Sequence, residues 1–221
     1  ILQELYQDVA KQFGGGDIFK SRGTVVTVPY YFKAHQCEHT RKAAAIADIN
    51  CIGLIQEPIA ASLAYAWQLV QERPNKEIKE NILVFDLGGG TFDLTLFCLH
   101  QTPKKLLFEV LATGGDDRLG GMDFDECLYN LILRKGGVSL EGFSDTEQKK
   151  ARQKVMEQAV EAKITLSSAE DTYVTVTDVI PGQHIDIRLT RAEFEESIQI
   201  YINKIDSIVQ KLWATANLRP S

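Results

Sequence analysis

Several features that would assign a protein to a broad class are missing from this sequence. The 221 residues contain only four cysteines, and these lack the CxxC or CxH spacing typical of a zinc site or a redox pair. This pattern favours free thiols in a reducing compartment over a disulfide framework. No hydrophobic run has the length of a membrane span, and the first residues, ILQELYQDVA, lack the basic leader and cleavage site of a signal peptide. We therefore predict a cytoplasmic protein with no membrane partner.

The sequence also lacks an excess of positive charge and the usual histidine signatures. Its net charge is −6 and no Lys/Arg cluster stands out, which argues against nucleic acid as a partner. His35 and His39 are four residues apart in a predicted helix, but no third metal ligand accompanies them, so we expect both at the surface. No Ser–His–Asp or Cys–His nucleophile signature is present.

The composition that remains, 44% hydrophobic and 24% charged residues, is typical of a soluble globular protein. The chain has no initiator Met and begins inside a helical pattern that ends at Gly14–Gly16, from which we expect a piece excised from a longer protein. The next elements alternate: a strand at Thr24–Val28, a helix from about 34 to 48, a strand at Ile52–Ile55 and a helix at Ile59–Val70. This order predicts a βαβ unit.

The rest of the chain predicts a strand meander followed by helices and one hairpin. Glu77–Glu80, after Arg73-Pro74-Asn75, is expected to be a linker, Lys105–Ala112 a strand, and residues 113–117 a loop. The elements expected after them are a helix at Phe124–Arg134, a long helix capped by Ser144 and Glu147 that runs to about Leu166, a hairpin around Pro181-Gly182, and a last helix from Thr190 to about Trp213.

The strongest functional signal is Asn81–Leu99, NILVFDLGGGTFDLTLFCL. We expect a buried strand to deliver Asp86 to its end, and a second strand to leave after Thr91 and Asp93. Between the two strands lie Gly88, Gly89 and Gly90. Glycines tolerate φ > 0 and let backbone N–H groups approach a ligand, a combination that suits phosphate, and two aspartates suit a hydrated Mg²⁺. We favour this hypothesis over a simple turn with capping acids, since a turn requires fewer glycines.

The single residues of this site leave alternatives open. Asp86 would position a nucleophilic water, hold the water shell of a metal, or merely cap the glycine turn. A plain structural role is more probable for Asp93 than for Asp86, namely that of an acid on an exposed strand face. Thr91 would bond a phosphate or the attacking water, or cap the turn. Glu57 could merely cap a helix. It also follows the strand Ile52–Ile55, however, and ligands of α/β proteins gather at such strand ends. Glu57 and Asp86 are therefore candidates for a water-mediated Mg²⁺ site.

A pair of glycines and two positions of the long helix give weaker signals. Gly120-Gly121 would be a hinge or the loop before the next helix. Lys163 and Ser167 are four residues apart on the long helix and share one face, which would meet the sugar or base of a ligand. Spacing alone favours a solvated helix face for both.

Four motifs occur in order along the chain: VVTVPYYF (Val25–Phe32), IQEPIAASLAYA (Ile55–Ala66), VFDLGGGTFDLTLF (Val84–Phe97) and LGGMDFDE (Leu119–Glu126). Together they resemble the ATPase domain of the DnaK-type, heat-shock-protein-70 molecular chaperones. Two further segments, Phe108–Asp125 and Ala162–Asp171, look closest to the branch of this family that serves iron–sulfur cluster assembly.

The resemblance implies an α/β fold of the actin-like ATPase (ribonuclease H-like) class, with two lobes around an ATP cleft. The chain would hold only part of that fold: part of lobe I and the first part of lobe II. Residues 1–70 would be the C-terminal part of the lobe I core and 71–119 the start of the lobe II core. Residues 120–196 would form the α+β outer subdomain of lobe II, and 197–221 a helix that returns to its core.

The resemblance also implies that Mg²⁺-ATP hydrolysis gates a separate peptide-binding domain for client proteins. A J-domain co-chaperone and, in the narrower branch, an iron–sulfur scaffold protein would be partners. Phosphate would be held by Gly88, Gly89, Gly90 and Thr91. The metal's waters and the attacking water would be served by Asp86, Asp93 and Glu57. The adenosine side would be lined by Gly121, Lys163 and Ser167. Catalysis would rest on positioning and electrostatics.

Several departures from the family pattern accompany the resemblance. The first phosphate loop, the assisting lysine of lobe I and the Gly-Gly-Ser/Thr adenosine loop are not in the chain, so we expect about half of the site and no ATP hydrolysis by the chain alone. Val160 and Ile164 replace a glutamate and an arginine around the adenine, which predicts weaker adenine binding and favours the iron–sulfur branch. Cys37 replaces the arginine eight residues after Pro29 that takes part in interlobe signalling.

Two other functions stay open. A small-molecule kinase of the same actin-like superfamily would use the same acids on a sugar or acid substrate. A non-enzymatic interaction lobe would bind nucleotide poorly or not at all. The run FDLGGGTFD and the lack of a substrate-binding insertion favour the chaperone over the kinase, while the missing loops favour the interaction lobe for the chain by itself.

Overall fold

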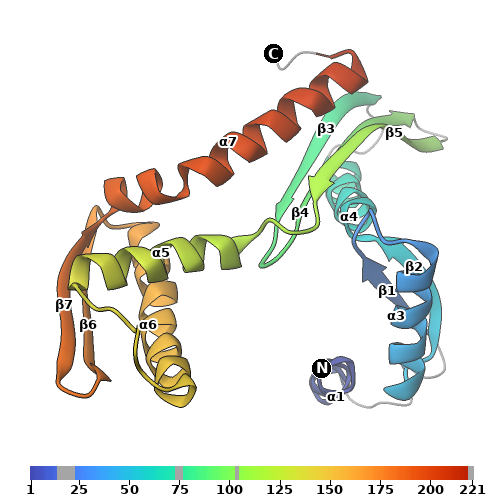
Figure 1. Ribbon diagram of the computed structural model, residues 1–221. Coiled ribbons are helices and arrows are strands. Elements are labelled where there is room, and N and C mark those ends of the chain that lie inside the picture. Colours follow the sequence, from blue (N-terminus) through green and yellow to red (C-terminus); the bar gives the residue numbers. More distant parts are fainter. Residues whose placement is uncertain (14–22, 73–76, 103–104, 219–221) are drawn as a thin grey trace. The chain divides into compact units, whose positions relative to one another are not determined.

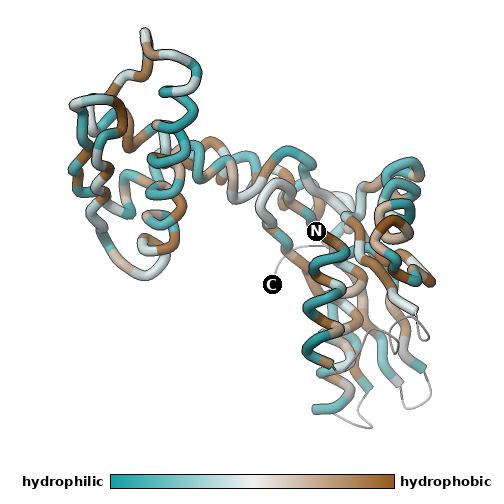
Figure 2. The backbone as a smooth tube through the Cα atoms, turned by 90° about the horizontal axis from the view of Figure 1, so that it is seen from below, coloured by the Kyte–Doolittle hydropathy of each residue, from teal (hydrophilic) through white to brown (hydrophobic). Residues whose placement is uncertain are grey.

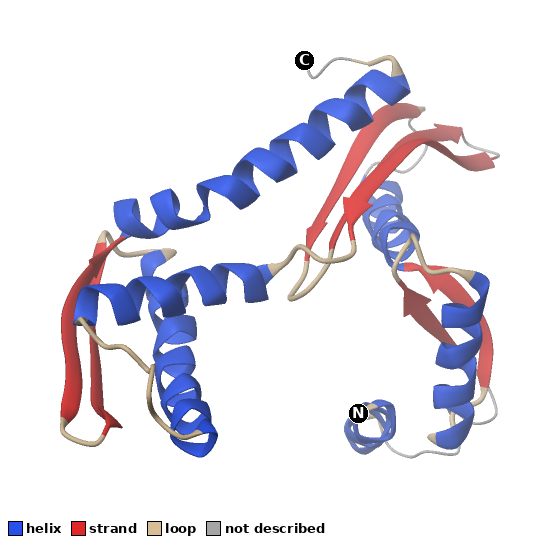
Figure 3. Ribbon diagram, viewed as in Figure 1, coloured by secondary structure: helices blue, strands red, loops and turns tan. Residues whose placement is uncertain are grey.

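The structure, a computed structural model, describes residues 1–13, 23–72, 77–102 and 105–218, which form two compact units (Figures 1 and 3). Unit 1 contains the described residues of 1–86 and 93–114, with 215–218. Unit 2 contains 87–92 and 115–214. Within the described ranges, no helix combines the length and the hydrophobicity that crossing a membrane requires. The predicted helix end at Gly14–Gly16 and the segment Arg73-Pro74-Asn75 lie outside the described residues.

Unit 1 begins with the predicted βαβ arrangement. Its elements are α1 (Leu2–Gln12), β1 (Thr24–Val28), α3 (Ala34–Ile46), β2 (Cys51–Gln56) and α4 (Glu57–Glu72). β1 and β2 pair in parallel, with Val28 opposite Gln56, so both strands end at the same level. Leu2 and Tyr6 of α1 pack against the buried Ala44 and Ile49. The parallel pair confirms the βαβ prediction and brings the residues that follow β1 and β2 to one edge.

The remaining strands of unit 1 form a sheet in the order β3-β4-β5. Their bounds are β3 Ile78–Leu87, β4 Phe92–Thr102 and β5 Lys105–Asp116. β4 is the central strand, and Phe92 to Phe97 are all buried. Ala66 and Leu69 of α4 share a core cluster with Phe97 and Leu99 of β4. A central strand that is covered on both faces explains why its hydrophobic run is nearly continuous.

Two sequence predictions for this sheet were wrong. The predicted linker at Glu77–Glu80 largely belongs to β3, which begins at Ile78, a residue only 5% exposed. The predicted loop at residues 113–117 is strand as far as Asp116. Gly115 adopts φ 154°, a conformation that residues with a side chain rarely adopt. Polar and glycine residues that are typical of loops can therefore continue a strand here.

Unit 2 consists of three helices and one hairpin. They are α5 (Gly121–Gly136), α6 (Asp145–Leu166), β6 (Asp171–Ile180), β7 (Gln183–Thr190) and α7 (Arg191–Ala216). These elements confirm the predicted helices and hairpin, except that α5 begins at Gly121 rather than Phe124. Hydrophilic and hydrophobic residues alternate along the helices, as expected for amphipathic elements (Figure 2).

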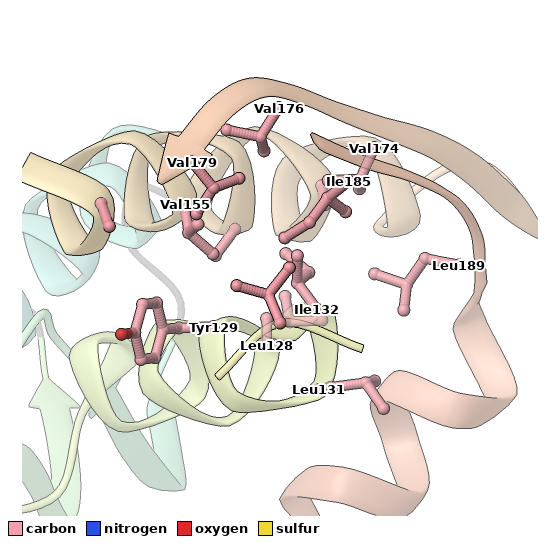
Figure 4. Packing of buried hydrophobic residues seen from close by; sticks show 14 of the residues in the cluster. Leu128, Tyr129, Leu131, Ile132, Val155, Val174, Val176, Val179, Ile185 and Leu189 are labelled. Carbon is pink, nitrogen blue, oxygen red and sulfur yellow. The ribbon is translucent and has the colours of Figure 1, made fainter. Parts of the chain in front are cut away.

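The core of unit 2 lies between α5, α6 and the hairpin (Figure 4). Leu128 and Ile132 of α5 and Val155 of α6 are fully buried, as are Ile185 and Leu189 of β7. Fully burying a side chain of this size contributes about 1.5–3 kcal/mol. The core therefore fixes the position of α5 relative to α6, which matters for the site described below.

Polar contacts form at the predicted N-terminal caps of α6 and α7. The Ser144 hydroxyl accepts the N–H of Glu147, as predicted. Glu193 accepts hydrogen bonds from the N–H and the hydroxyl of Thr190, both at 2.9 Å, and pairs with Lys135 at 2.5 Å. Lys135 also donates to the carbonyl of Arg188 at 2.7 Å. The hydrogen bond from Lys135, followed by those from Thr190, lowers the pKa of Glu193 to about 2.

Replacing Glu193 with Gln is expected to reduce the free energy of unfolding at pH 7 by about 1 kcal/mol, because the pair is partly exposed and screened by water. A lowered pKa contributes stability above the ordinary value of 4.5, and this contribution is lost as the pH falls toward 2. Urea denaturation at several pH values should show the difference shrinking below pH 4.5. Glu196→Gln, at an exposed position of the same helix, is the control and should show no such loss. A deficit of Glu193→Gln that does not change with pH would contradict this account.

Candidate functional site

Three carboxylates of unit 1 lie close together. Glu57 directly follows β2, Asp86 is the penultimate residue of β3, and Asp93 is the second residue of the antiparallel neighbour β4. Burial raises the pKa of Glu57, and the charge of Asp86 raises it further. Burial and then the charges of Glu57 and Asp86 raise the pKa of Asp93 to about 6. The structure therefore brings together the three acids predicted from the sequence.

Asp93 is the most constrained of these acids. Its side chain is 2% exposed, and within the described residues its Oδ1 atom has no hydrogen-bond partner. A backbone hydrogen bond from Tyr30, which follows β1, is the interaction that favours its ionised form. A buried carboxylate beside two others is costly unless a cation compensates it. The three acids thus fit a bound cation.

The described carboxylates do not form a site that ligates a metal ion directly. Among the residues that the structure describes, no group of three or more Asp, Glu, His or Cys side chains is placed to hold a metal ion. Carboxylates that do not ligate a cation directly can still bind its water shell, and Mg²⁺ commonly keeps several of its waters.

The exposure of the two aspartates differs from what the buried strand before Asp86 and the exposed-face explanation of Asp93 suggested. Asp86 is exposed, and Phe85 beside it is 49% exposed, whereas Asp93 is buried rather than on an exposed strand face. The reason is the strand order, because β3 is an edge strand and β4 is the central strand. The polar residues Asp93 and Thr95 within the buried run of β4 were the signal that could have indicated this.

The glycine turn belongs to unit 2 and rests on the first turn of α5. The N–H of Gly88 donates to the carbonyl of Thr91 at 2.9 Å, which closes the turn. The N–H groups of Gly121 and Met122 donate to the carbonyls of Gly88 and Gly89, each at 2.8 Å. Two of the otherwise unpaired N–H groups of the helix N-terminus therefore hold the turn.

The outer side of the turn presents backbone donors. Among the described residues, the N–H groups of Gly89 and Gly90 donate to no protein acceptor. A Cβ built on Gly89 would meet no atom within 4 Å, so this side of the turn is open. Thr91, which is half-buried, adds a hydroxyl beside these donors. Free adjacent N–H groups in a concave backbone suit an anion such as phosphate.

Beside the glycine turn, Gly120 has no room for a side chain, and the sequence did not single it out for that reason. A Cβ there would lie 2.5 Å from the carbonyl carbon of Gly89 and from the nitrogen of Gly90. None of the three turn glycines, all within the described residues, has a positive φ, so the turn does not use the left-handed backbone that glycine tolerates. Asp123, which accepts the N–H of Gly120 at 2.8 Å, was a sequence signal for a helix start at this position.

The residues predicted on α6 lie on one face of that helix. The ammonium of Lys163 pairs with Asp125 at 2.6 Å and donates to the carbonyl of Gly121 at 3.3 Å. Ser167 caps the end of α6 and its hydroxyl donates to the carbonyl of Lys163 at 3.1 Å. Lys163 and Gly121 therefore lie beside the glycine turn within unit 2, and Ser167 lies one helical turn further along. The contacts of Tyr30 and Asp125 were not foreseen, and no local pattern marks Asp125.

Comparison with known proteins gives one consistent family. The family model described as Hsp70 protein matches residues 1–221. The chain is 38% identical over 223 residues to "Chaperone protein DnaK" of Prochlorococcus marinus, covering 99% of the chain and 32% of that protein. It is 36% identical over 231 residues to "Chaperone protein DnaK" of Thermus thermophilus, covering 100% of the chain and 34% of that protein. The chain thus spans about a third of the length of these relatives.

Proposed function

The chain belongs to the Hsp70 family, and from this premise we propose that it forms part of the ATP-binding and ATP-hydrolysing domain of a molecular chaperone. The predicted α/β fold of the actin-like ATPase class is the fold of this family, and the mixed strands and helices of both units agree with it. The observation that carries the functional proposal is the short segment Asp86–Asp93. It joins an open glycine turn to a buried carboxylate that lacks a partner at one oxygen among the described residues.

Each part of this segment has a role that its chemistry supports. The N–H groups of Gly89 and Gly90 and the Thr91 hydroxyl are donors for phosphate oxygens, and Gly88 shapes the turn through its bond to the Thr91 carbonyl. A bound Mg²⁺-nucleotide would supply positive charge and the phosphoryl group. Hydrolysis then needs little more than positioning and electrostatic stabilisation.

The three carboxylates have different roles in binding water molecules. Asp86 is exposed and can accept hydrogen bonds from an attacking or metal-bound water, and Glu57 can do the same from the end of β2. Asp93 is held by the N–H of Tyr30, and its free oxygen supplies negative charge to a cation's water shell. The positive charge of such a cation would keep Asp93 ionised at neutral pH.

The adenosine side of the nucleotide is assigned to Gly121, Lys163 and Ser167. These residues lie on α5 and α6 next to the glycine turn, and Lys163 is the cation among them. Val160 and the 66% exposed Ile164 share this face of α6 and provide apolar contact for a base without hydrogen-bond donors. We retain the expected segments for the domain, with 1–70 in lobe I, 71–119 and 197–221 in the lobe II core, and 120–196 in its outer subdomain.

Hydrolysis assays on the natural protein that carries this sequence test the proposal against a small-molecule kinase. We expect ATP to be converted to ADP and phosphate without any small acceptor, and turnover to rise when a J-domain co-chaperone is added. Turnover that requires a sugar or an acid would favour the kinase. A protein that neither binds nor hydrolyses ATP would leave only the interaction lobe.

The chaperone role extends the proposal to partners. The named relatives are called chaperones, which supports client proteins and co-chaperones as partners. The cytoplasm remains the compartment that we expect. The apolar Val160 and Ile164 favour the iron–sulfur assembly branch within the family. Stimulation of ATP turnover by an iron–sulfur scaffold protein, and not by a general unfolded client, is the result expected for that branch.

A further inference from the structure

Lys163 makes an ion pair and a hydrogen bond with α5. Its ammonium lies 2.6 Å from Asp125 Oδ1 and 3.3 Å from the carbonyl oxygen of Gly121. The side chains of Lys163 and Asp125 are only 26% and 13% exposed. An ammonium has three N–H donors, and its hydrogen bond to the carbonyl of Gly121 leaves donors for a ligand.

The position of this ammonium is tied to the glycine turn by main-chain hydrogen bonds. Gly121, whose carbonyl accepts from Lys163, donates its own N–H to the carbonyl of Gly88 at 2.8 Å. A Cβ built on Gly121 would lie 3.4 Å from the Lys163 nitrogen. The ammonium therefore lies at the first residue of α5, which is bonded directly to the glycine turn.

A second ion pair between the same two helices provides a comparison. Glu126, the neighbour of Asp125 on α5, accepts two hydrogen bonds from Arg152 of α6, at 3.1 and 2.5 Å. Arg152 also covers the ring of Tyr129 at 4.8 Å. Arg152 precedes Lys163 by about 16 Å along α6 at the usual helical rise. Both pairs join α5 to α6, but only the pair of Asp125 lies beside the glycine turn.

We propose that Asp125 is a positioning residue for nucleotide binding, which acts by holding the Lys163 ammonium beside the glycine turn. The inference rests on the proposed nucleotide function. A free lysine side chain has many rotamers, and holding it before the ligand arrives removes the entropy cost of ordering it on binding. The Glu126–Arg152 pair stabilises the contact between the helices and has no part in binding.

Titration of Mg-ADP into the natural protein, by calorimetry, tests this proposal. Asp125→Asn is expected to weaken ADP affinity about tenfold, because an ordered lysine is replaced by a mobile one. Glu126→Gln, which breaks the neighbouring pair, should leave affinity unchanged. A merely structural role of Asp125 would lower thermal stability in both variants without separating their affinities.

A double-mutant cycle identifies the route through Lys163. Lys163→Met should weaken binding by itself, and adding Asp125→Asn to it should weaken binding no further. The double variant buries no unpaired charge, so this comparison remains valid even where Asp125→Asn alone does not fold. Unchanged affinity in Asp125→Asn or in Lys163→Met, or a further loss in the double variant, would overturn the role of Asp125 while leaving the nucleotide function intact. A wild-type protein that binds no ADP would overturn both.

Discussion

Replacing Asp93 with Asn is expected to stabilise the nucleotide-free protein and to weaken its ATPase activity at the same time. Burial beside Glu57 and Asp86 raises the pKa of Asp93 to about 6, so the ionised carboxylate destabilises the fold at neutral pH. The asparagine amide has nearly the same shape and keeps an oxygen that can accept from the N–H of Tyr30. Removing the charge should increase the free energy of unfolding at pH 7.5 by about 2 kcal/mol.

The pH dependence of this gain has a definite sign. Because the pKa of Asp93 is raised from 3.8 to about 6, its contribution to stability is fully present below pH 4 and is lost as the pH rises through 6. Urea denaturation of Asp93→Asn should therefore show no gain at pH 4 and the full gain at pH 7.5. Glu109→Gln, at an exposed carboxylate of β5 in the same sheet, should change neither value.

The same substitution is expected to lower the ATPase activity. Loss of a carboxylate that holds the water shell of a metal typically lowers metal affinity or activity by about 10- to 100-fold. We expect a loss of ATP turnover in this range for Asp93→Asn, measured on the natural protein at saturating Mg²⁺. A variant that is less stable than wild type at pH 7.5, or one that keeps full turnover, would refute the assignment of Asp93.

Replacing Gly120 with Ala is expected to destabilise unit 2 by about 2 to 3 kcal/mol, since the new methyl group has no room. A Cβ at this position would lie 2.5 Å from backbone atoms of Gly89 and Gly90, which cannot rotate away as a side chain can. The main-chain bonds of Gly121 and Met122 to the turn would have to lengthen or break. Urea denaturation would measure the loss directly.

The matched control is Gly89→Ala, which places the same methyl group in open space. Its stability should equal that of wild type or exceed it by up to about 1 kcal/mol, because alanine restricts the unfolded chain. The methyl group would nevertheless stand on the open side of the turn, so nucleotide affinity should fall. A stable Gly120→Ala, or a Gly89→Ala that binds nucleotide as wild type does, would show that the turn is not held and used as described.

The elements that sequence reasoning placed correctly are those whose signals are local. The capping pair of Ser144 and Glu147, the hairpin around Pro181-Gly182 and the β-branched strand Thr24–Val28 all form as predicted. In each case the residues that decide the structure are neighbours in the chain. The hydrophobic period and the turn chemistry therefore sufficed.

The predictions that failed depended on contacts distant in sequence. Whether Asp86 or Asp93 is buried is decided by which strand lies at the centre of the sheet, and the segment itself does not contain that information. Residues 113–116 continue β5, the strand that lies next to the central strand β4. The need for glycine at Gly120 arises from the backbone of Gly89 and Gly90, some thirty residues earlier in the printed sequence.

The central claim is that the segment Asp86–Asp93 binds the phosphates of a Mg²⁺-nucleotide. Calorimetric titration of ADP into the natural protein, in Mg²⁺ and again in EDTA, tests it most directly. We expect saturable binding in Mg²⁺ that weakens at least about tenfold in EDTA, because without the metal the carboxylates and the nucleotide phosphates repel each other. We also expect that Asp93→Asn loses most of this Mg²⁺ dependence. Absence of binding, or equal affinity with and without Mg²⁺ in both proteins, would contradict it.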